Sequence, residues 1–285
     1  MTCPSDGPVD AATLREWGLP VPGRTKQSRG DAVVVGASRR TPGAVMLALE
    51  AALRVGAGRV ATLVPGSVDA VIGAQLPEAA VFALPEDAGE PIDGAAATAL
   101  EHADAVLVGP GFDDVAETRA TLMAVVKSGV RRLVLDAYAL AVLDHVPRGA
   151  LPRDLVLTPN EDELRMLTHT VDGDDIDLGR LVVKAARRFD ATIAAYGLVG
   201  TPDGALLSVE GGGPGLATAG SGDALAGAGT GFLARGLPSD RACAWALWAH
   251  ARAGDRLTVR RGLGFLAREL VGELADAVHD VQGTD

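Results

Sequence analysis

The segment Gly220-Ser221-Gly222-Asp223 contains the residue types and spacing that most clearly indicate chemistry in this chain. It runs directly into the small-residue stretch 224–229, which is typical of a closely packed helix. At such a turn, backbone N–H groups and the positive end of a helix dipole surround one point, and the carboxylate of Asp223 lies beside it. The segment therefore predicts an anion site next to a base, and hence phosphate chemistry on a hydroxyl-bearing small molecule.

The elements expected to position this turn form repeated β-α units. Short apolar runs closed by Pro, Gly, Asp or Thr-Pro alternate with longer helical patterns, such as the helix expected over Gly43–Val55. The expected strands are Ala32–Val35, Arg59–Val64, Ala79–Leu84, Ala105–Val108, Arg132–Leu135 and Leu155–Leu157. From Ser221 onward the pattern is almost wholly helical. With 36 glycines and an aromatic share of 4%, the chain predicts an α/β fold in which helices cover a mostly parallel sheet.

Four segments fall outside the β-α repeat. Thr192–Tyr196 and Ala205–Val209 predict a late hairpin pair, because Thr201–Gly204 between them is a strong turn signal. Pro85–Gly94 and Thr170–Asp177 are acidic, and we expect both to be surface loops.

Composition limits the classes of function. The 285 residues are 48% hydrophobic with a formal net charge of -11, so an acidic surface would repel nucleic acid. No apolar run approaches the roughly 20 residues of a membrane span, and the N-terminus lacks the pattern of a signal peptide. Cys3 and Cys243 have no zinc-ligand or C-x-x-C spacing. We expect a cytoplasmic protein with one domain over 26–285, preceded by an arm over 1–25 whose Leu14–Trp17 segment packs on the body.

Residues that directly follow the expected strands are the first candidates for a ligand site, because open α/β sheets bind ligands outside the carboxyl ends of their strands. Gly36-Ala37-Ser38 would let backbone approach a ligand, although a tight strand-to-helix turn explains it equally well. Gly109-Pro110-Gly111 suits a loop against a flat ligand, but a plain turn is the simpler interpretation. Asp136 could orient a hydroxyl or a metal-bound water, or it could cap the helix that begins near Tyr138.

Asn160 and Glu163 lie three residues apart at the start of another helix. A capping box explains this pair structurally. In the functional alternative, Asn160 contacts substrate and Glu163 positions a magnesium-bound water. Asp223 could take a proton from a hydroxyl while the neighbouring amides hold a phosphoryl group. An ordinary first-turn carboxylate would not need the surrounding glycines. The five histidines form no ligand cluster, and we expect His250 to be a hydrogen-bonded, partly buried side chain.

Taken in order, five motifs resemble the ADP/ATP-dependent NAD(P)H-hydrate dehydratases. The resemblance covers roughly residues 26 to 278. The motifs are Gly36-Ala37-Ser38 with Gly43-Ala44, Gly109-Pro110-Gly111, Leu135-Asp136-Ala137, Leu157-Thr158-Pro159 with Glu163, and Gly220-Ser221-Gly222-Asp223. It implies a ribokinase-like fold, a three-layer αβα sandwich around a mostly parallel sheet. It also implies that ADP or ATP phosphorylates the C6 hydroxyl of a hydrated nicotinamide, after which phosphate leaves to restore NADH or NADPH.

The resemblance also assigns roles to residues and implies partners. Asp223 would be the base on the C6 hydroxyl, and Ala44, Gly111 and Asn160 would line the substrate site with it. The nucleotide would be held by Tyr196, Gly197, Gly220, Ser221 and Gly222. Mg2+ is the implied ion, with Glu163 acting through a water. The implied partners are the hydrate, an adenine nucleotide and a separate NAD(P)H-hydrate epimerase, because no epimerase domain is fused here. Relatives are often homo-oligomers such as tetramers, and a monomer is equally compatible with the helix faces.

Several positions depart from the family pattern. The usual Lys-Gly is Tyr196-Gly197 here, which removes a positive charge expected near the phosphates. The usual Asp-Ala-Asp ends in Tyr138, the usual histidine is Asn160, and the usual asparagine of a late loop is Gly213.

Two other functions remain open on the sequence alone. A kinase of the same fold, acting on a vitamin or sugar hydroxyl, would have the same anion site and base. A non-catalytic nucleotide-binding protein would keep the pocket, and the loss of the lysine at Tyr196 supports that alternative.

Overall fold

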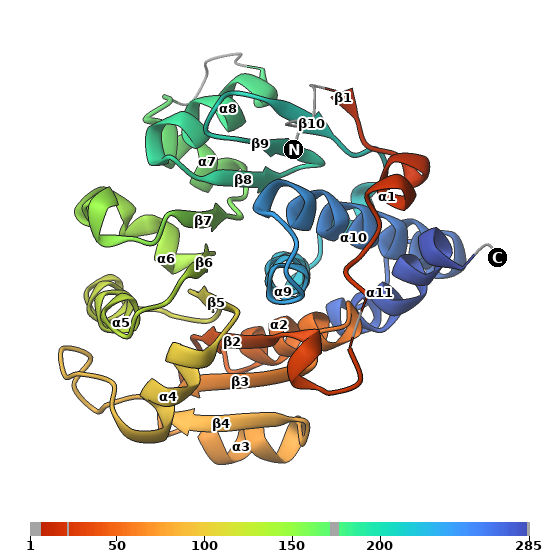
Figure 1. Cartoon of the computed structure of the whole chain (residues 1–285). Helices are drawn as coiled ribbons and strands as arrows, with labels where there is room; N and C mark the ends of the chain where they lie inside the picture. The colour runs from red at the N-terminus through yellow and green to blue at the C-terminus, as the bar shows by residue number, and fades with distance from the viewer. Residues whose placement is uncertain (1–6, 22, 172–176, 284–285) are drawn as a thin grey trace.

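A ten-stranded sheet lies between two layers of helices (Figure 1). The computed structural model describes residues 7–21, 23–171 and 177–283. Across the sheet the strands are β1 (Gly7–Pro8), β10 (Leu206–Ser208), β9 (Leu198–Gly200), β8 (Thr192–Ala195), β7 (Asp154–Leu157), β6 (Arg132–Leu135), β5 (Ala105–Val108), β2 (Asp31–Val35), β3 (Arg59–Val64) and β4 (Ala79–Ala83). Neighbouring strands are parallel except at β9, which is antiparallel to both β8 and β10. The expected α/β sandwich around a mostly parallel sheet is confirmed.

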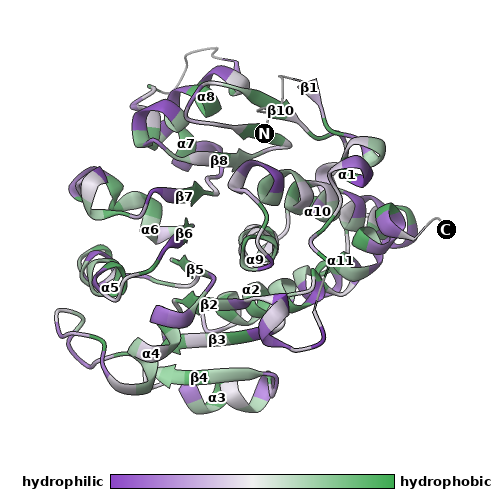
Figure 2. Ribbon diagram, viewed as in Figure 1, coloured by the Kyte–Doolittle hydropathy of each residue, from purple (hydrophilic) through white to green (hydrophobic). Residues whose placement is uncertain are grey.

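The central strands are buried on both sides, because successive side chains point to opposite faces of a sheet. In β5, Ala105 and Leu107 join one core cluster, and Val106 and Val108 join the other. The first face is covered by α1 (Ala11–Trp17), α2 (Gly43–Arg54), α3 (Asp69–Gln75), α9 (Ser221–Ala234), α10 (Ser239–Arg261) and α11 (Ala267–Gln282). The second is covered by α4 (Gly94–His102), α5 (Val115–Lys127), α6 (Tyr138–Ala141), α7 (Glu161–Thr168) and α8 (Leu178–Phe189). Figure 2 shows the hydrophobic strands between these layers.

Small residues bring α9 against α2 and so fix the position of the Gly220–Asp223 turn. A Cβ atom on Gly227 would lie 2.2 Å from the carbonyl oxygen of Ala48 in α2. Gly231, one turn later, faces Ala52 in the same way. Only glycine permits so close an approach of the two backbones. The small-residue run after Asp223 therefore serves to pack the helix whose first turn faces the candidate site.

The late hairpin prediction is wrong in its pairing, because β9 lies between the two expected strands. Tyr196 and Gly197 both have positive φ, 50° and 75°, and they form a tight turn from β8 into β9. The Thr201–Gly204 turn then connects β9 to β10, with the Gly204 N–H donating to the Thr201 carbonyl at 2.9 Å. β9 could not be predicted from the sequence because it is only three residues long. The turn before it also begins at Tyr196, a residue type that rarely adopts a left-handed conformation.

The N-terminal segment is joined to the rest of the structure at two places. β1 pairs in parallel with β10 at the edge of the sheet, and Leu14 of α1 is fully buried. Residues 85–93 form an irregular connection before α4, as expected for a loop. Of the second expected loop, Thr170–Asp177, residues 172–176 lie outside the described residues, as does Cys3. No helix in the described ranges is long and apolar enough to cross a bilayer.

Four short 3-10 helices complete the described structure, and one of them borders the candidate site. They are η1 (Gln27–Arg29), η2 (Leu143–His145), η3 (Arg148–Ala150) and η4 (Pro214–Leu216). Cys243 is buried in α10 as a free thiol, and burial raises its pKa. Trp245 of the same helix is also completely buried, which agrees with a packing role in the core.

Candidate active site

A cavity of about 710 Å³ opens at the carboxyl ends of β6, β7 and β8, facing the first turn of α9. This is the position at which open α/β sheets bind ligands. Eight of the ten site residues predicted from sequence line it: Asn160, Glu163, Tyr196, Gly197, Gly220, Ser221, Gly222 and Asp223. The remaining two, Ala44 and Gly111, are not among its lining residues.

The start of α9 offers free backbone donors to this cavity. Gly220 has a left-handed φ of 88°, and its carbonyl accepts the Ala224 N–H at 3.1 Å. Within the described ranges, the N–H groups of Gly222 and Asp223 have no acceptor. A Cβ atom on Gly222 would meet nothing within 4 Å, so open space lies in front of this turn. Unpaired amides at a helix N-terminus are suited to binding an anion.

His250 of α10 fixes the first residue of this helix. Its Nε2 lies 2.9 Å from Ser221 Oγ and 3.0 Å from the Ser221 carbonyl oxygen. Because a carbonyl can only accept, the proton lies on Nε2 and is shared between the two oxygens. Burial lowers the pKa of His250 to about 4, so the ring is neutral at physiological pH. The expectation of a hydrogen-bonded histidine is confirmed, although His250 is fully rather than partly buried.

Asp223 lies in the first turn of α9, beside the free amides. It is half-buried, and burial raises the pKa of its carboxyl group to about 6. A carboxylate with a pKa just below physiological pH is ionised there and is a stronger base than an ordinary aspartate. The structure therefore places a competent base next to a site for an anion.

A second carboxylate, Asp136, lines the same cavity, and the sequence offered it either as a group that orients a hydroxyl or a metal-bound water or as a helix cap. It follows β6 and is only 6% exposed. The alternative of a helix cap is wrong, because Ala137 is the N-cap of α6 and no side chain caps that helix. Asp136 Oδ1 instead accepts a hydrogen bond of 2.8 Å from Thr158 Oγ1. Burial, helped by the charges of Asp223 and Glu163, raises the pKa of Asp136 to about 7 despite that bond.

Asn160 and Glu163 form the capping box that was one interpretation of their spacing. Asn160 Oδ1 accepts the Glu163 N–H at 2.9 Å, and Glu163 Oε2 accepts the Asn160 N–H at 2.8 Å. Burial raises the pKa of Glu163. These bonds begin α7 at the edge of the cavity, so both side chains line it while they cap the helix. Contact with a substrate and with a magnesium-bound water remain predictions.

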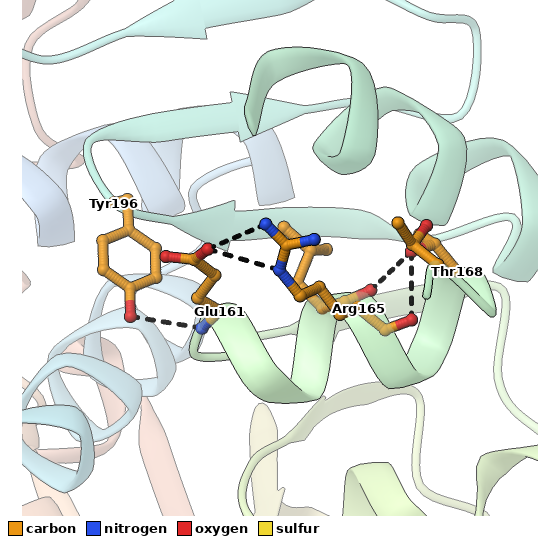
Figure 3. A network of polar contacts seen from close by, with 6 residues as sticks. Glu161, Arg165, Thr168 and Tyr196 are labelled. Atoms are coloured by element: carbon orange, nitrogen blue, oxygen red, sulfur yellow. Dashed lines mark hydrogen bonds and ion pairs between the residues drawn. The ribbon is translucent and has the colours of Figure 1, made fainter. Parts of the chain in front are cut away.

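Tyr196, which replaces the family's usual lysine, lies in the turn between β8 and β9 and is 57% exposed. Its hydroxyl accepts the Glu161 N–H at 3.1 Å, at the start of α7 (Figure 3). Glu161 in turn forms an ion pair with Arg165 at 3.2 Å. Among the described residues that line the cavity there is no lysine or arginine. Phosphate charge in this cavity would therefore be balanced by amides, a helix dipole and a bound cation rather than by a basic side chain.

Ala44 and Gly111 lie beside one another and are not among the residues that line this cavity. A Cβ atom on Gly111, whose φ is 76°, would lie 3.2 Å from Ala44 Cβ. Thr41 Oγ1 donates to the Gly111 carbonyl at 2.6 Å and holds the two loops together. A separate cavity of about 840 Å³ is lined by neighbours of these loops in sequence, Ala37, Ser38 and Phe112 among others. The structure therefore gathers the predicted nucleotide residues with Asn160 and Asp223 but leaves Ala44 and Gly111 outside that group.

Backbone strain gathers around the same sheet edge. Five non-glycine residues in the described ranges have positive φ, and three of them, Ala37, Ala137 and Tyr196, come within two residues after strands β2, β6 and β8. The other two end helices α7 and α8. Strained backbone is commonly retained where function requires it. All three turns could be recognised from the sequence, but their strained residues could not, because none of these three positions is a glycine.

The mostly parallel sheet, with an anion-binding turn and a base at its carboxyl edge, defines an α/β enzyme of ribokinase-like architecture. A ribokinase-like superfamily protein from Enterococcus faecalis superposes with a TM-score of 0.82 and 25% identity, covering 96% of this chain and 95% of the other. The ADP/ATP-dependent NAD(P)H-hydrate dehydratase of Bacillus subtilis, co-crystallised with ATP and Mg2+, superposes with a TM-score of 0.81 at 22% identity, covering 95% and 97%.

Sequence comparison identifies the family within that architecture. Residues 32–275 match the NAD(P)H-hydrate dehydratase family, so the chain belongs to it. The chain is also 41% identical, over 96% of both sequences, to the ADP-dependent (S)-NAD(P)H-hydrate dehydratase of Xanthomonas campestris. It spans about half the length of a bifunctional NAD(P)H-hydrate repair enzyme from Salinibacter ruber, to which it is 35% identical over 87% of its own length.

Proposed function

We propose that this protein converts (S)-NAD(P)H-hydrate back to NAD(P)H at the expense of ADP or ATP. The observation that carries the proposal is the first turn of α9, where the Asp223 carboxylate lies beside free backbone N–H groups. This turn occurs in a chain that belongs to the NAD(P)H-hydrate dehydratase family. The enzyme is thus a lyase that repairs damaged nicotinamide nucleotides. The 41% identity to a named ADP-dependent dehydratase, over nearly the whole of both chains, supports the same activity.

In the proposed mechanism the amides of Gly222 and Asp223 hold the terminal phosphoryl group of the nucleotide. Asp223 takes the proton from the C6 hydroxyl, and the oxygen attacks the phosphorus. Phosphorylation turns a poor leaving group into a good one. The C6–O bond then breaks with release of inorganic phosphate, and the dihydropyridine ring is restored.

The residues of the cavity fit a magnesium ion that is held mainly by phosphates and water. Asp136, Glu163 and Asp223 all line the cavity, yet no three acidic, histidine or cysteine side chains in the described ranges come together as a metal site. Mg2+ usually keeps several waters and takes only one or two carboxylates beside substrate phosphates. Glu163 would hold such an ion through a water. Bound there, Mg2+ supplies positive charge to the phosphates where no lysine or arginine does.

The test is a spectroscopic assay on the purified chain. The hydrate, Mg2+ and either ADP or ATP are mixed with protein, and the absorbance of reduced nicotinamide is followed. We expect nucleotide-dependent formation of NADH or NADPH by the wild type and formation slower by about a thousandfold by Asp223→Asn. A stable phosphorylated product without ring restoration would indicate a kinase instead. Nucleotide binding without any turnover would indicate a non-catalytic relative.

The proposed activity also implies a setting. We infer that an NAD(P)H-hydrate epimerase supplies the reactive epimer, because bifunctional NAD(P)H-hydrate repair enzymes are among the relatives of this chain. We place the protein in the cytoplasm, where reduced nicotinamide nucleotides are made and used. We keep a homo-oligomer, such as a tetramer, as a hypothesis that light scattering tests directly.

A further inference from the structure

The proposed reaction removes two protons from its substrate, and this inference rests on that reaction. Relative to NADH, the hydrate carries a hydroxyl group on C6 and an extra hydrogen on C5. The hydroxyl proton must leave when C6–O attacks phosphorus, and a C5 proton must leave when phosphate departs. Asp223, once protonated by the hydroxyl, has no remaining basic capacity for the second proton. The second proton must therefore pass to another acceptor within the same turnover, either a second side chain or the departing phosphate.

The cavity wall contains few groups that could accept that proton. Its other titratable side chains are Asp136, Glu163, Tyr196 and His250. Glu163 is engaged in the capping box, and burial lowers the pKa of His250 to about 4, which makes this ring a weak base. Tyr196 carries a phenol whose oxygen accepts the Glu161 N–H. Of the two carboxylates in this set, Glu163 caps a helix and Asp136 does not.

The surroundings of Asp136 suit a positioned base. Thr158 Oγ1 holds Oδ1 at 2.8 Å, and it is the one side chain among the described residues that donates to Asp136. The side chain follows β6, whereas Asp223 begins α9, so the two carboxylates enter the cavity from different elements. They are near enough for the charge of Asp223 to act on Asp136.

We propose that Asp136 is the second base of the reaction and takes the proton from C5. As the C6–O bond breaks, its electron pair leaves with phosphate, and the lone pair of the ring nitrogen forms an iminium to C6. Asp136 then accepts the C5 proton, the C5–H electron pair forms the C5=C6 bond, and the lone pair returns to nitrogen. Asp136 passes this proton to the departing phosphate, which leaves as hydrogen phosphate, and Asp223 releases the hydroxyl proton to water. In sum, ATP and hydrate give ADP, inorganic phosphate, NADH and one proton, and ADP in place of ATP gives AMP.

The chemistry of the carboxyl group agrees with this role. Burial and the neighbouring charges raise the pKa of Asp136 to about 7, which is the range in which general bases work best at neutral pH. A C–H bond next to an iminium is far more acidic than an ordinary C–H bond. A carboxylate of this basicity is therefore strong enough to remove the C5 proton from the iminium.

The experiment measures phosphate released per NADH formed by the full chain, with the hydrate, Mg2+ and ATP. Wild type is expected to give a ratio near one. Asp136→Asn mimics the protonated acid and can still accept from Thr158. We expect it to keep phosphate release within about tenfold while NADH formation falls by about a hundredfold or more, the usual contribution of a general base. The stranded iminium is recaptured by water, so the ratio rises and the recovered hydrate contains both C6 epimers.

Three outcomes separate this inference from its alternatives. An unchanged ratio in Asp136→Asn, or equal loss of phosphate release and NADH formation, overturns the role of Asp136. In Thr158→Val the carboxylate is kept and only its hydrogen bond is lost, so the ratio should stay near one. A ratio raised as far as in Asp136→Asn would attribute the effect to a displaced loop and would also overturn the assignment. If wild type forms no NADH at all, the proposed function itself fails. Thermal unfolding of each variant checks that it is folded.

Discussion

The two walls of the cavity are built by different means. The α9 wall presents backbone amides at a turn that is fixed by His250 and by close packing of α9 on α2. The wall formed by the ends of β6 and β7 presents carboxyl groups whose pKa values are raised by burial. The first wall is suited to holding phosphate and carries one base, Asp223, whereas the second wall carries carboxyl groups that can move protons. Basic side chains, the usual means of holding phosphate, are absent from the described lining of both walls.

The largest effect is expected at Asp223, the carboxylate of the α9 wall. Asp223→Asn removes the base but leaves the amides, so NADH formation should fall by about a thousandfold, within the usual range for a general base. Nucleotide affinity, measured by calorimetry, should change little. If nucleotide affinity fell as much as the rate, the carboxylate of Asp223 would be needed to bind nucleotide as well as to accept the proton, which would contradict this division of roles.

The pH profile should also be steep, because both proposed bases must be ionised. With pKa values of about 6 for Asp223 and about 7 for Asp136, kcat/KM for NADH formation should fall about a thousandfold from pH 8 to pH 5. Phosphate release by Asp136→Asn depends on Asp223 alone and should fall only about tenfold. The two profiles are compared with saturating nucleotide. Identical slopes in both assays would contradict a second base.

Asp136 should make the folded protein less stable as pH rises. Its folded pKa of about 7 is above the ordinary aspartate value of 3.8, so the folded state binds more protons than the unfolded state between these values. The resulting loss of stability is about 4 kcal/mol at pH 8 and nothing below pH 4, because a tenfold change in proton affinity is worth about 1.4 kcal/mol. Asp136→Asn should therefore be more stable than wild type at pH 8 by at most that amount.

Chemical denaturation at pH 8 and pH 4 measures this difference. The control is Glu210→Gln, a carboxylate that is exposed and should change stability little at either pH. Equal effects of Asp136→Asn at both pH values would show that the aspartate is not held in its neutral form by burial.

The smallest effect is expected at the position where the family's lysine is absent. Tyr196→Lys places a cation beside the amide wall, and nucleotide should bind about tenfold more tightly, the worth of one charge-assisted hydrogen bond. Tyr196→Phe removes only the bond from the Glu161 N–H, so affinity should remain close to that of wild type. Calorimetry with ADP and ATP gives both values. Equal affinities for all three proteins would show that the phosphates do not approach Tyr196.

The α9 wall could be predicted from sequence because its geometry is local. Gly220 supplies the left-handed N-cap directly before Ser221–Ala234, and the following small residues have the spacing that close helix packing needs. The strands of the sheet centre were also predictable, since their apolar runs are continuous. β9 was missed because three residues after a left-handed tyrosine give no periodic signal.

The carboxylate wall depends on contacts between distant segments and was less accessible. Asp136 could be recognised as a strand-end acid, but its hydrogen bond to Thr158 joins residues 22 positions apart. Its burial, which raises the pKa, results from the packing of several loops. Ala44 and Gly111 were expected to share a site with Asp223, whereas the structure places them against each other outside the cavity wall.

The most direct test of the proposed function is the stoichiometry of one reaction. Purified protein is given (S)-NADH-hydrate, Mg2+ and a limiting amount of ADP or ATP, and NADH and phosphate are measured at completion. We predict one NADH and one phosphate for each nucleotide consumed. Consumption of nucleotide without formation of NADH, or accumulation of a stable phosphoester, would contradict the proposal.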